Sequence, residues 1–573
     1  MIPIRRGSRP ETLLHQVHWL LEHKPNATAI ILRDGEREQA ITYADFFMSA
    51  ARYAHALEAA GVQSGDLVVL VLPHGESVVY GFWGALLIGA VPSIFPFLSD
   101  KLDRDRYFES VRRLIEHSRA RVVIADEALA VPLRDHLAGL PSLAAIVNAE
   151  RLEPGGDPNA YLSRPLPDAN TTAFLQHSSG STGLQKGVML SHRAVINQIA
   201  SYSEAIRLQP DDVIVSWLPL YHDMGLIAAF VLPIMQAIPL VLMSPFQWVR
   251  EPQMMLHAIT THRGTLCWLP NFAYNFLAQR LRDSALEGVD LSSLRAVINC
   301  SEPVYADSHR AFCNRFAPYG LREHVLLTCY AMAENTFAVT QSAVGKPPRV
   351  DRVDRRALAE TQIAQPVQGD TPTVEIVSCG TPIAGCDARV VGAGGEPLSD
   401  RRVGEIILHS DSMLSGYYRR PDLTSEAIRD GWYFTGDMGY LADGELYVTG
   451  RKKDLIIVSG KNVYPQDIEN LLHDVPGVHP GRVVAFGVKN AQLGTEDVAV
   501  LVEANSADLL DDADAKAAIS RTIRARVAQN TEVTARYVHV VAPKWLIKTS
   551  SGKIARAANR DKFLKELRID GQG

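Results

Sequence analysis

The stretch FLQHSSGSTGLQKGVMLSH, residues 174–192, places a loop rich in hydroxyl groups and glycine between a short apolar strand and a predicted helix. Residues 178–183 hold four hydroxyl side chains and two glycines, and Lys186 follows them. Glycines let backbone N–H groups approach a polyphosphate closely, hydroxyls add donors, and a lysine adds positive charge. Ser191 is a good N-cap for the helix that begins there. The pattern indicates a phosphate-binding loop, although composition alone leaves a flexible surface loop as an equal alternative. The spacing is not the G-x-x-x-x-G-K-[ST] of P-loop NTPases.

Alternating helix and strand patterns surround this loop. Helical spacing of apolar residues occurs at residues 43–60, 79–89 and 107–118. Continuous runs of Val, Ile and Leu, typical of buried parallel strands, occur at residues 67–73, 91–97, 121–126, 212–219, 239–244, 264–270 and 294–300. Strands that alternate with helices predict an α/β fold in which parallel or mixed sheets are covered by helices.

The character of the chain changes after about residue 340. Residues 346–373 are polar and contain no long apolar run, which indicates an insertion or surface excursion. Short strands with Gly-Asp turns follow, and then a compact α+β pattern. We expect an N-terminal domain of residues 1–450, which includes an insertion at about 345–378 and a β-rich subdomain at about 379–450, then a hinge at about 451–454 and a small mobile C-terminal domain of residues 454–573.

Composition narrows the class of protein. The 573 residues are 47% hydrophobic and 21% charged, so the chain can bury a large core. The net charge of −6 argues against a general nucleic-acid binder, which would carry a strongly basic domain. The six cysteines form no C-x-x-C pair, so neither a disulfide scaffold nor a zinc module is indicated. With no signal peptide visible at the N-terminus, we expect a cytoplasmic protein.

Two uncharged runs are long enough to span a bilayer by count, at residues 77–99 and 224–249. Glycine and proline interrupt both runs, and no cluster of basic residues flanks them to set an orientation. Each is better interpreted as a buried helix that leads into a short strand. We therefore expect no stable insertion into a membrane.

Further short motifs follow the loop along the chain. They are WLPLYHDMG at 217–225, CSEPV at 300–304, YAMAE at 330–334, YFTGD at 433–437, GRKKD at 450–454 and SSGKI at 550–554. Together with SSGSTGLQKGVMLSH, they resemble in sequence and order the motifs of the adenylate-forming superfamily. This superfamily includes acyl-CoA synthetases, fatty-acyl-AMP ligases, luciferases and the adenylation domains of peptide synthetases.

The resemblance implies a ligase that joins a carboxylic acid to ATP with the help of Mg²⁺, giving acyl-AMP and pyrophosphate. It assigns the nucleotide to Ser178, Ser179, Gly180, Ser181, Thr182, Gly183, Lys186, Ser301, Glu302, Pro303, Tyr330, Ala331, Asp437 and Arg451. Glu334 would ligate Mg²⁺ together with Thr182, and Asp437 would bind the ribose hydroxyls with support from Arg451. Without the resemblance, Glu334 and Asp437 are more simply interpreted as solvated surface carboxylates.

The resemblance also implies catalytic roles for Lys553, Glu334 and His222. Lys553 would bridge the carboxylate and the α-phosphate when the C-terminal domain closes about a pivot at Lys453. His222 is better interpreted as a gate or wall of the acyl pocket than as a general base, because the substrate carboxylate is already ionised at pH 7. The acyl pocket would comprise His222, Asn271, Phe272 and Tyr274.

Several segments resemble the fatty-acyl-AMP ligase branch, including LPLYHDMGLI, PNFAY at 270–274 and the insertion after Glu334. This branch transfers its acyl group to the phosphopantetheine thiol of an acyl carrier protein, in polyketide, nonribosomal peptide or lipid biosynthesis. Its insertion is thought to restrict the domain movement that transfer to CoA needs. The loop SSGSTGLQKG is closer to CoA ligases, however, and Ala331 replaces an expected glycine. A CoA thioester synthetase is therefore the alternative. The length of the acyl chain and the choice between monomer and homodimer stay open.

Overall fold

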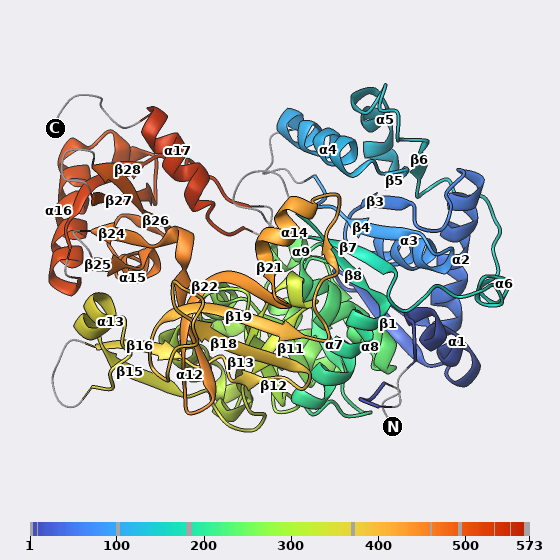
Figure 1. Cartoon of the computed structure of the whole chain (residues 1–573), viewed down its shortest axis with the longest axis horizontal. Helices are drawn as coiled ribbons and strands as arrows, with labels where there is room; N and C mark the ends of the chain where they lie inside the picture. The colour runs from blue at the N-terminus through green and yellow to red at the C-terminus, as the bar shows by residue number, and fades with distance from the viewer. Residues whose placement is uncertain are drawn as a thin grey trace.

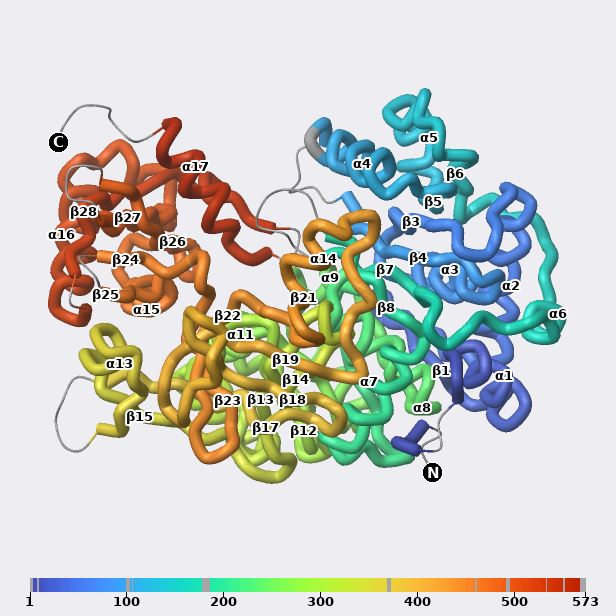
Figure 2. The backbone as a smooth tube through the Cα atoms, viewed as in Figure 1, coloured from blue at the N-terminus to red at the C-terminus, as the bar shows by residue number. Residues whose placement is uncertain are grey.

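The computed structural model describes residues 4–7, 10–98, 104–178, 186–367, 373–458, 461–490, 495–531, 533–549 and 552–566. Figures 1 and 2 show a large part, built from the N-terminal strands and helices, beside a smaller C-terminal part coloured orange to red. The predicted α/β class is confirmed, since the large part contains two mixed sheets with helices packed on them.

The first sheet has seven strands and carries the two strands on either side of the phosphate-loop sequence. Its order is β20 (Gly416–Tyr417), β8 (Lys186–Ser191), β7 (Thr172–Ser178), β4 (Val91–Ile94), β3 (Leu67–Val71), β5 (Val122–Ala125) and β6 (Ala145–Asn148). The strands from β7 to β6 are parallel, whereas β8 is antiparallel to β7. The pairing of Ser178 with Lys186 brings the two ends of the loop sequence together.

The second sheet has nine strands. Its order is β17 (Thr381–Pro382), β14 (Ala338–Gln341), β13 (Leu326–Ala331), β12 (Ala296–Asn299), β11 (Leu266–Leu269), β9 (Ile214–Ser216), β10 (Leu240–Met243), β1 (Thr28–Asp34) and β2 (Arg37–Thr42). The six strands from β13 to β1 are parallel, and the antiparallel pairs lie at the two edges. The carboxyl ends of parallel strands share one edge of a sheet, which is where ligands bind in open α/β folds.

Helices fill the space around these sheets. They are α1 (Leu13–His23), α2 (Tyr43–Ala59), α3 (Glu76–Leu87), α4 (Arg104–Ser118), α5 (Glu127–His136), α6 (Pro158–Leu162), α7 (His192–Ala205), α8 (Leu232–Gln236), α9 (Pro245–Arg250), α10 (Gln253–His262), α11 (Asn271–Arg280) and α12 (Ala306–Phe316). Ser191 caps α7 as predicted, because its side chain accepts from the backbone N–H of Ala194 at 3.1 Å. Helices α2 and α3 approach so closely that a Cβ at Gly84 would lie 2.6 Å from the carbonyl oxygen of Ala50.

The polar segment after residue 345 forms more structure than its composition predicts. Strands β15 (Val350–Asp354) and β16 (Thr373–Val377) pair as an antiparallel ladder, and α13 (Arg355–Thr361) follows β15. Val353 and Leu358 are buried in one cluster with Tyr440 and Tyr447. Too few apolar residues are present to show a periodic pattern in the sequence. Val353 and Leu358 are buried because the β-rich subdomain contributes most of the other residues of this cluster.

The β-rich subdomain and the C-terminal part complete the chain. The subdomain contains β18 (Cys386–Val391), β19 (Gly404–Ser410), β21 (Ile428–Arg429), β22 (Trp432–Ala442) and β23 (Glu445–Arg451) in one antiparallel sheet, with α14 (Pro421–Ala427) beside it. The C-terminal part contains β24 (Ile456–Val458), β25 (Lys461–Val463), α15 (Pro465–Asn470), β26 (Val478–Asn490), β27 (Thr495–Ala504), α16 (Ala513–Asn530), β28 (Ala535–Val541) and α17 (Arg556–Glu566). It has hydrophobic clusters of its own, around Ile523 and Phe563.

The two long uncharged runs fold inside the large part. The first forms α3 and β4, and the second forms a π-helix η1 (Met224–Val231), α8, β10 and α9. Within the described ranges, no helix has both the length and the apolar character that a membrane span requires.

Candidate functional site

Lys553 connects the two parts of the molecule. Its ammonium donates a hydrogen bond to the backbone carbonyl of Ser301, which lies just beyond β12. Ser301 has a φ of +69°, a left-handed conformation that is uncommon for a residue other than glycine. Before Lys553, Gly552 has a φ of +82°, so a side chain there would be strained. Two residues with left-handed backbone conformations therefore lie at the contact between the C-terminal part and the carboxyl edge of the nine-stranded sheet.

Asp437 lies between two donors on neighbouring elements. It faces Arg451 across the β22–β23 ladder, and the guanidinium Nε lies 3.2 Å from its Oδ1. Tyr330, near the end of β13, donates its hydroxyl to Oδ2 of Asp437 at 2.7 Å. Burial and the charge of Asp437 raise the pKa of Tyr330 well above its usual value, so the phenol stays a donor. The sheet pairing thus orients a carboxylate beside the segment that the sequence assigns to the nucleotide.

Glu334 and Lys186 both contact the side chain of Tyr417. Tyr417 on β20 donates its hydroxyl to Oε1 of Glu334 at 3.0 Å, and the ammonium of Lys186 lies 4.7 Å from the centre of the Tyr417 ring. The Tyr417 hydroxyl also lies 3.1 Å from that of Tyr433. A carboxylate and a lysine that are far apart in the sequence therefore both contact Tyr417, the carboxylate at its hydroxyl and the ammonium over its ring.

His222 is a neutral side chain in this environment. Its Nε2 is buried and meets no hydrogen-bond partner in the part of the chain that the structure describes. Burial, with a contribution from the positive charge of Lys553, lowers the pKa of His222 to about 3. A histidine with so low a pKa is a poor proton acceptor at neutral pH.

Asp223 is a candidate that the sequence reasoning missed, although it stands next to His222 in the YHDMG motif. Its carboxylate accepts from the backbone N–H of Met224 at 2.8 Å, at the start of η1. Burial raises the pKa of Asp223, and Lys553 and Glu334 both contribute to its electrostatic environment. π-Helical segments often occur at functional sites. Asp223 is therefore close enough to Lys553 and Glu334 for their charges to affect its pKa, as the charge of Lys553 affects that of His222.

The three other residues predicted for the acyl pocket differ in exposure. Asn271 is buried, and its Oδ1 accepts from Asn299 Nδ2 at 3.0 Å while its Nδ2 donates to Ser308 Oγ at 3.1 Å. Tyr274 is fully buried in the core, and its hydroxyl donates to the carbonyl of Val297 at 3.2 Å. Phe272 is 43% exposed. The membership of all three in an acyl pocket stays a prediction.

The remaining predicted residues fall into three groups. Ser179, Gly180, Ser181, Thr182 and Gly183 lie outside the described residues, and Ser178 is described only as the last residue of β7. Ala331 ends β13, Pro303 is exposed, and Glu302 accepts from the backbone N–H of Phe272 at 3.1 Å. Lys453 lies in a single helical turn, η6 (Lys452–Asp454), and burial lowers its pKa.

The insertion contacts the C-terminal part directly. Glu360 on α13 forms an ion pair of 3.1 Å with Lys461 on β25. Arg355 at the start of α13 donates to the backbone carbonyl of Asn530, the last residue of α16. In Figure 1, α13 lies below β25 on the left, and the two elements are in contact. The insertion therefore links the β-rich subdomain to the small C-terminal part in this arrangement.

The chain resembles known proteins in both sequence and structure. Residues 17–418 match the family described as AMP-binding enzyme, and residues 460–560 match the AMP-binding enzyme C-terminal domain. A putative acyl-CoA synthetase of Caulobacter vibrioides is 30% identical over 92% of this chain and 91% of its own length. The medium-chain-fatty-acid–[acyl-carrier-protein] ligase JamA of Moorena producens is 30% identical over 97% of this chain and 96% of its own. A solved structure from a study of fatty acyl-adenylate ligases from E. coli and L. pneumophila has a TM-score of 0.88 and 28% identity, and covers 98% of this chain and 99% of its own.

Proposed function

Since the chain belongs to the AMP-binding enzyme family, we propose that it activates a fatty acid, or another apolar carboxylic acid, with ATP and transfers the acyl group to a carrier protein. The first half-reaction forms acyl-AMP and releases pyrophosphate. The second passes the acyl group to the phosphopantetheine thiol of an acyl carrier protein and releases AMP. The observation that carries the proposal is the contact between Lys553 and Ser301, which brings the Lys553 ammonium from the C-terminal part to the assigned nucleotide site.

In the first half-reaction, a carboxylate oxygen attacks the α-phosphorus of ATP, and the bond to the bridging oxygen of pyrophosphate breaks. Two anions must approach each other, so fixed positive charge near the α-phosphate lowers the barrier. Lys553 supplies that charge, and Lys186 holds the departing phosphates. The substrate needs no general base because its carboxylate is already ionised, which agrees with the low pKa of His222. We assign His222 to the wall of the acyl site.

Asp437 and Arg451 bind the ribose end of the nucleotide. A carboxylate can accept from two hydroxyls at once. Tyr330 and Arg451 hold the Asp437 carboxylate at 2.7 and 3.2 Å, so it is oriented before ATP enters. Ser301, Glu302, Pro303 and Ala331 would then surround the adenine.

The residues around Glu334 fit a magnesium ion bound together with substrate. Mg²⁺ usually takes one or two carboxylates plus phosphate oxygens, and it keeps several waters. Within the described ranges, no group of three or more His, Cys, Asp or Glu side chains is arranged to hold a metal ion. Glu334, held by Tyr417 at 3.0 Å, offers one carboxylate near Lys186. When bound, Mg²⁺ would neutralise charge on the phosphates, and Thr182 would be a second protein ligand.

The insertion is the main reason for proposing a carrier protein, and not CoA, as the acceptor of the acyl group. A tie between α13 and the C-terminal part would oppose a large rotation of that part, which transfer to CoA is expected to need. The name of JamA, a ligase for an acyl carrier protein, supports the same assignment. The name of the Caulobacter vibrioides relative supports the second candidate, a CoA thioester synthetase.

The experiment has two stages. Purified protein is tested for ATP–pyrophosphate exchange with a panel of carboxylic acids, and then offered either CoA or a holo-acyl carrier protein, with the products identified by mass spectrometry. We expect acid-dependent exchange and an acyl group on the carrier. Exchange followed by acylation of CoA alone would establish the second candidate, and a lack of exchange with every acid would refute adenylation.

A further inference from the structure

Each of three neighbouring parallel strands is followed by an aromatic residue at the carboxyl edge of the nine-stranded sheet. Trp217 directly follows β9, Trp248 lies in α9 after β10, and Phe272 lies in α11 after β11. Strand β9 pairs in parallel with both β10 and β11. Because the carboxyl ends of adjacent parallel strands meet at one edge, the three rings converge where ligands bind in this class of fold.

The rings form one continuous aromatic wall, which we define as Trp217, Trp248, Phe272 and Phe276. The two indoles stack face to face with centroids 3.6 Å apart and planes 3° apart. Phe272 presents its edge to both indoles at 6.3 Å, and Phe276 lies 5.4 Å from Trp248. Exposure rises from 0% at Trp248 and 4% at Trp217 to 43% at Phe272, so the wall runs from the interior to the surface.

The indole N–H groups of the two tryptophans in the wall lack a hydrogen-bond partner among the described residues. The Nε1 atoms of Trp217 and Trp248 are both buried and meet no acceptor among the residues that the structure describes. Leaving a buried donor unpaired destabilises a protein, so each such group calls for an explanation. Trp83 is also unpaired and belongs to the same hydrophobic cluster as Trp217 and Trp248, but it lies on α3, which packs on β3 and β4 of the seven-stranded sheet. Among the unpaired indoles of the described residues, Trp217 and Trp248 are the two that follow strands of the nine-stranded sheet and stack on each other.

The wall adjoins the site where the carboxylate would be activated. The backbone N–H of Phe272 donates to Glu302, in the segment that also contains Ser301 and its contact with Lys553. Trp217 belongs to the same motif as His222, and the positive charge of Lys553 helps to lower the pKa of His222. An acid with its carboxylate at Lys553 can therefore extend its other end along the wall.

We propose that Trp217 and Trp248 form a subsite that recognises an oxygen atom on the acyl portion of the substrate, so that the preferred acid carries a hydroxyl or keto group beyond its carboxylate. The exposed ring of Phe272 packs against the methylene groups, and an indole N–H donates to the oxygen. An acid without that oxygen leaves the donors unpaired and is selected against. This inference rests on the proposed function, since it names the class of acid that the site takes.

The test compares decanoic acid with a series of oxodecanoic acids that carry the ketone at successive carbons. We expect one ketone position to raise kcat/KM for ATP–pyrophosphate exchange about tenfold over decanoic acid, the effect of one good hydrogen bond. In Trp217→Phe or Trp248→Phe, which keep an aromatic ring but lose the N–H, this ratio should fall toward one. The control Trp83→Phe removes an equally buried, unpaired indole elsewhere, and its ratio should equal that of the parent.

A binding measurement separates this inference from adenylation itself. In the full-length chain labelled with ¹⁵N-tryptophan, the seven tryptophans give seven indole N–H signals. Titration without ATP should shift one or both of the Trp217 and Trp248 signals downfield with the favoured oxo acid and not with decanoic acid. If a phenylalanine variant does not fold, the parent titration alone decides. The inference is overturned if no oxo acid shifts these signals, if decanoic acid shifts them equally, or if Trp83→Phe changes the ratio as much as the other variants. Failure of exchange with every acid would instead overturn the proposed function.

Discussion

The ammonium of Lys553 donates a hydrogen bond to the backbone carbonyl of Ser301, a residue 252 positions earlier in the chain. This contact joins the last loop of the C-terminal part to the carboxyl edge of the nine-stranded sheet. Their sequence neighbours Cys300 and Ile554 pack in different hydrophobic cores, so the contact depends on how the two parts are placed. Under the proposed mechanism, this lysine would couple closure of the C-terminal part to charge stabilisation.

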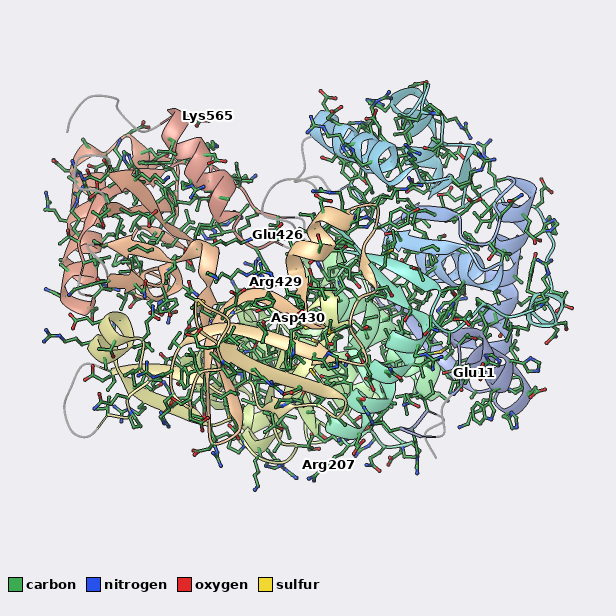
Figure 3. The ribbon with its side chains drawn as sticks, in the orientation of Figure 1. Glu11, Arg207, Glu426, Arg429, Asp430 and Lys565 are labelled. Atoms are coloured by element: carbon green, nitrogen blue, oxygen red, sulfur yellow. The ribbon has the colours of Figure 1, made fainter. Side chains whose placement is uncertain are left out.

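Lys553→Ala should reduce ATP–pyrophosphate exchange by about 10²–10³, the usual cost of removing one group that stabilises charge in a transition state. Lys565→Ala is the matched control. Figure 3 shows Lys565 on α17 at the outer side of the C-terminal part, far from the strands of the large sheets. The control should exchange at the parental rate. A Lys553→Ala protein that exchanges as fast as the parent would contradict the assigned role.

Asp437→Asn should raise the KM for ATP by about 10- to 100-fold, because a hydrogen bond to a charged group contributes about 1.5–3 kcal/mol. Initial rates at varied ATP and saturating acid measure the effect. Asp387→Asn is a suitable control, since Asp387 lies on β18 in the same sheet and forms an exposed pair with Arg389 at 2.9 Å. An unchanged KM in Asp437→Asn would show that the carboxylate does not bind the nucleotide.

Glu334→Gln should raise the Mg²⁺ concentration needed for half-maximal exchange by at least about tenfold, since loss of even an indirect partner of a metal ligand costs about 10- to 100-fold in affinity. A magnesium titration at fixed ATP measures this. Tyr417→Phe keeps the carboxylate and removes the hydrogen bond of 3.0 Å to it, together with the contact of 3.1 Å to the Tyr433 hydroxyl, so its shift should be smaller. An identical Mg²⁺ requirement in the parent and in Glu334→Gln would exclude Glu334 as a ligand.

Charge reversal between the insertion and the C-terminal part tests the choice of acceptor. Glu360→Lys places two positive charges where the ion pair of 3.1 Å now lies, and should increase acyl transfer to CoA about two- to fivefold, as expected for an exposed pair. The double variant Glu360→Lys with Lys461→Glu restores the pair and should return transfer to the parental level. Deletion of residues 348–372 should increase transfer further. A folded deletion variant with no gain in acyl-CoA would count against the restraint.

Asp467→Asn should change how stability depends on pH. Burial raises the pKa of Asp467 from 3.8 to about 6, against an opposing effect of Arg355. The folded state therefore binds this proton more tightly than the unfolded state, so the contribution of Asp467 falls as pH rises between these two values. The Tm of Asp467→Asn minus that of the parent should increase from pH 4 to pH 6.5. A constant difference across that interval would mean that Asp467 titrates as an ordinary carboxylate.

Much of the molecule was predictable because its signals are local. Ser191 capped its helix as predicted, and the apolar runs that became β3, β5, β10 and β12 form strands, since burial on both faces leaves a continuous apolar pattern. The motif residues Tyr330, Asp437 and Arg451, which are far apart in sequence, do lie together. They are close because of the strand order and the register of the β22–β23 ladder, and neither can be predicted from the short motif around each residue.

The sequence by itself determined the α/β class, the order of the elements and the residue types available for chemistry, because these depend on local propensity and the period of apolar residues. Only the tertiary structure decided that α13 contacts β25, that Trp217 stacks on Trp248 and that Lys553 reaches Ser301. Each of these contacts joins segments with separate local patterns. Whether two such segments meet depends on the packing of everything between them, which no short stretch of sequence contains.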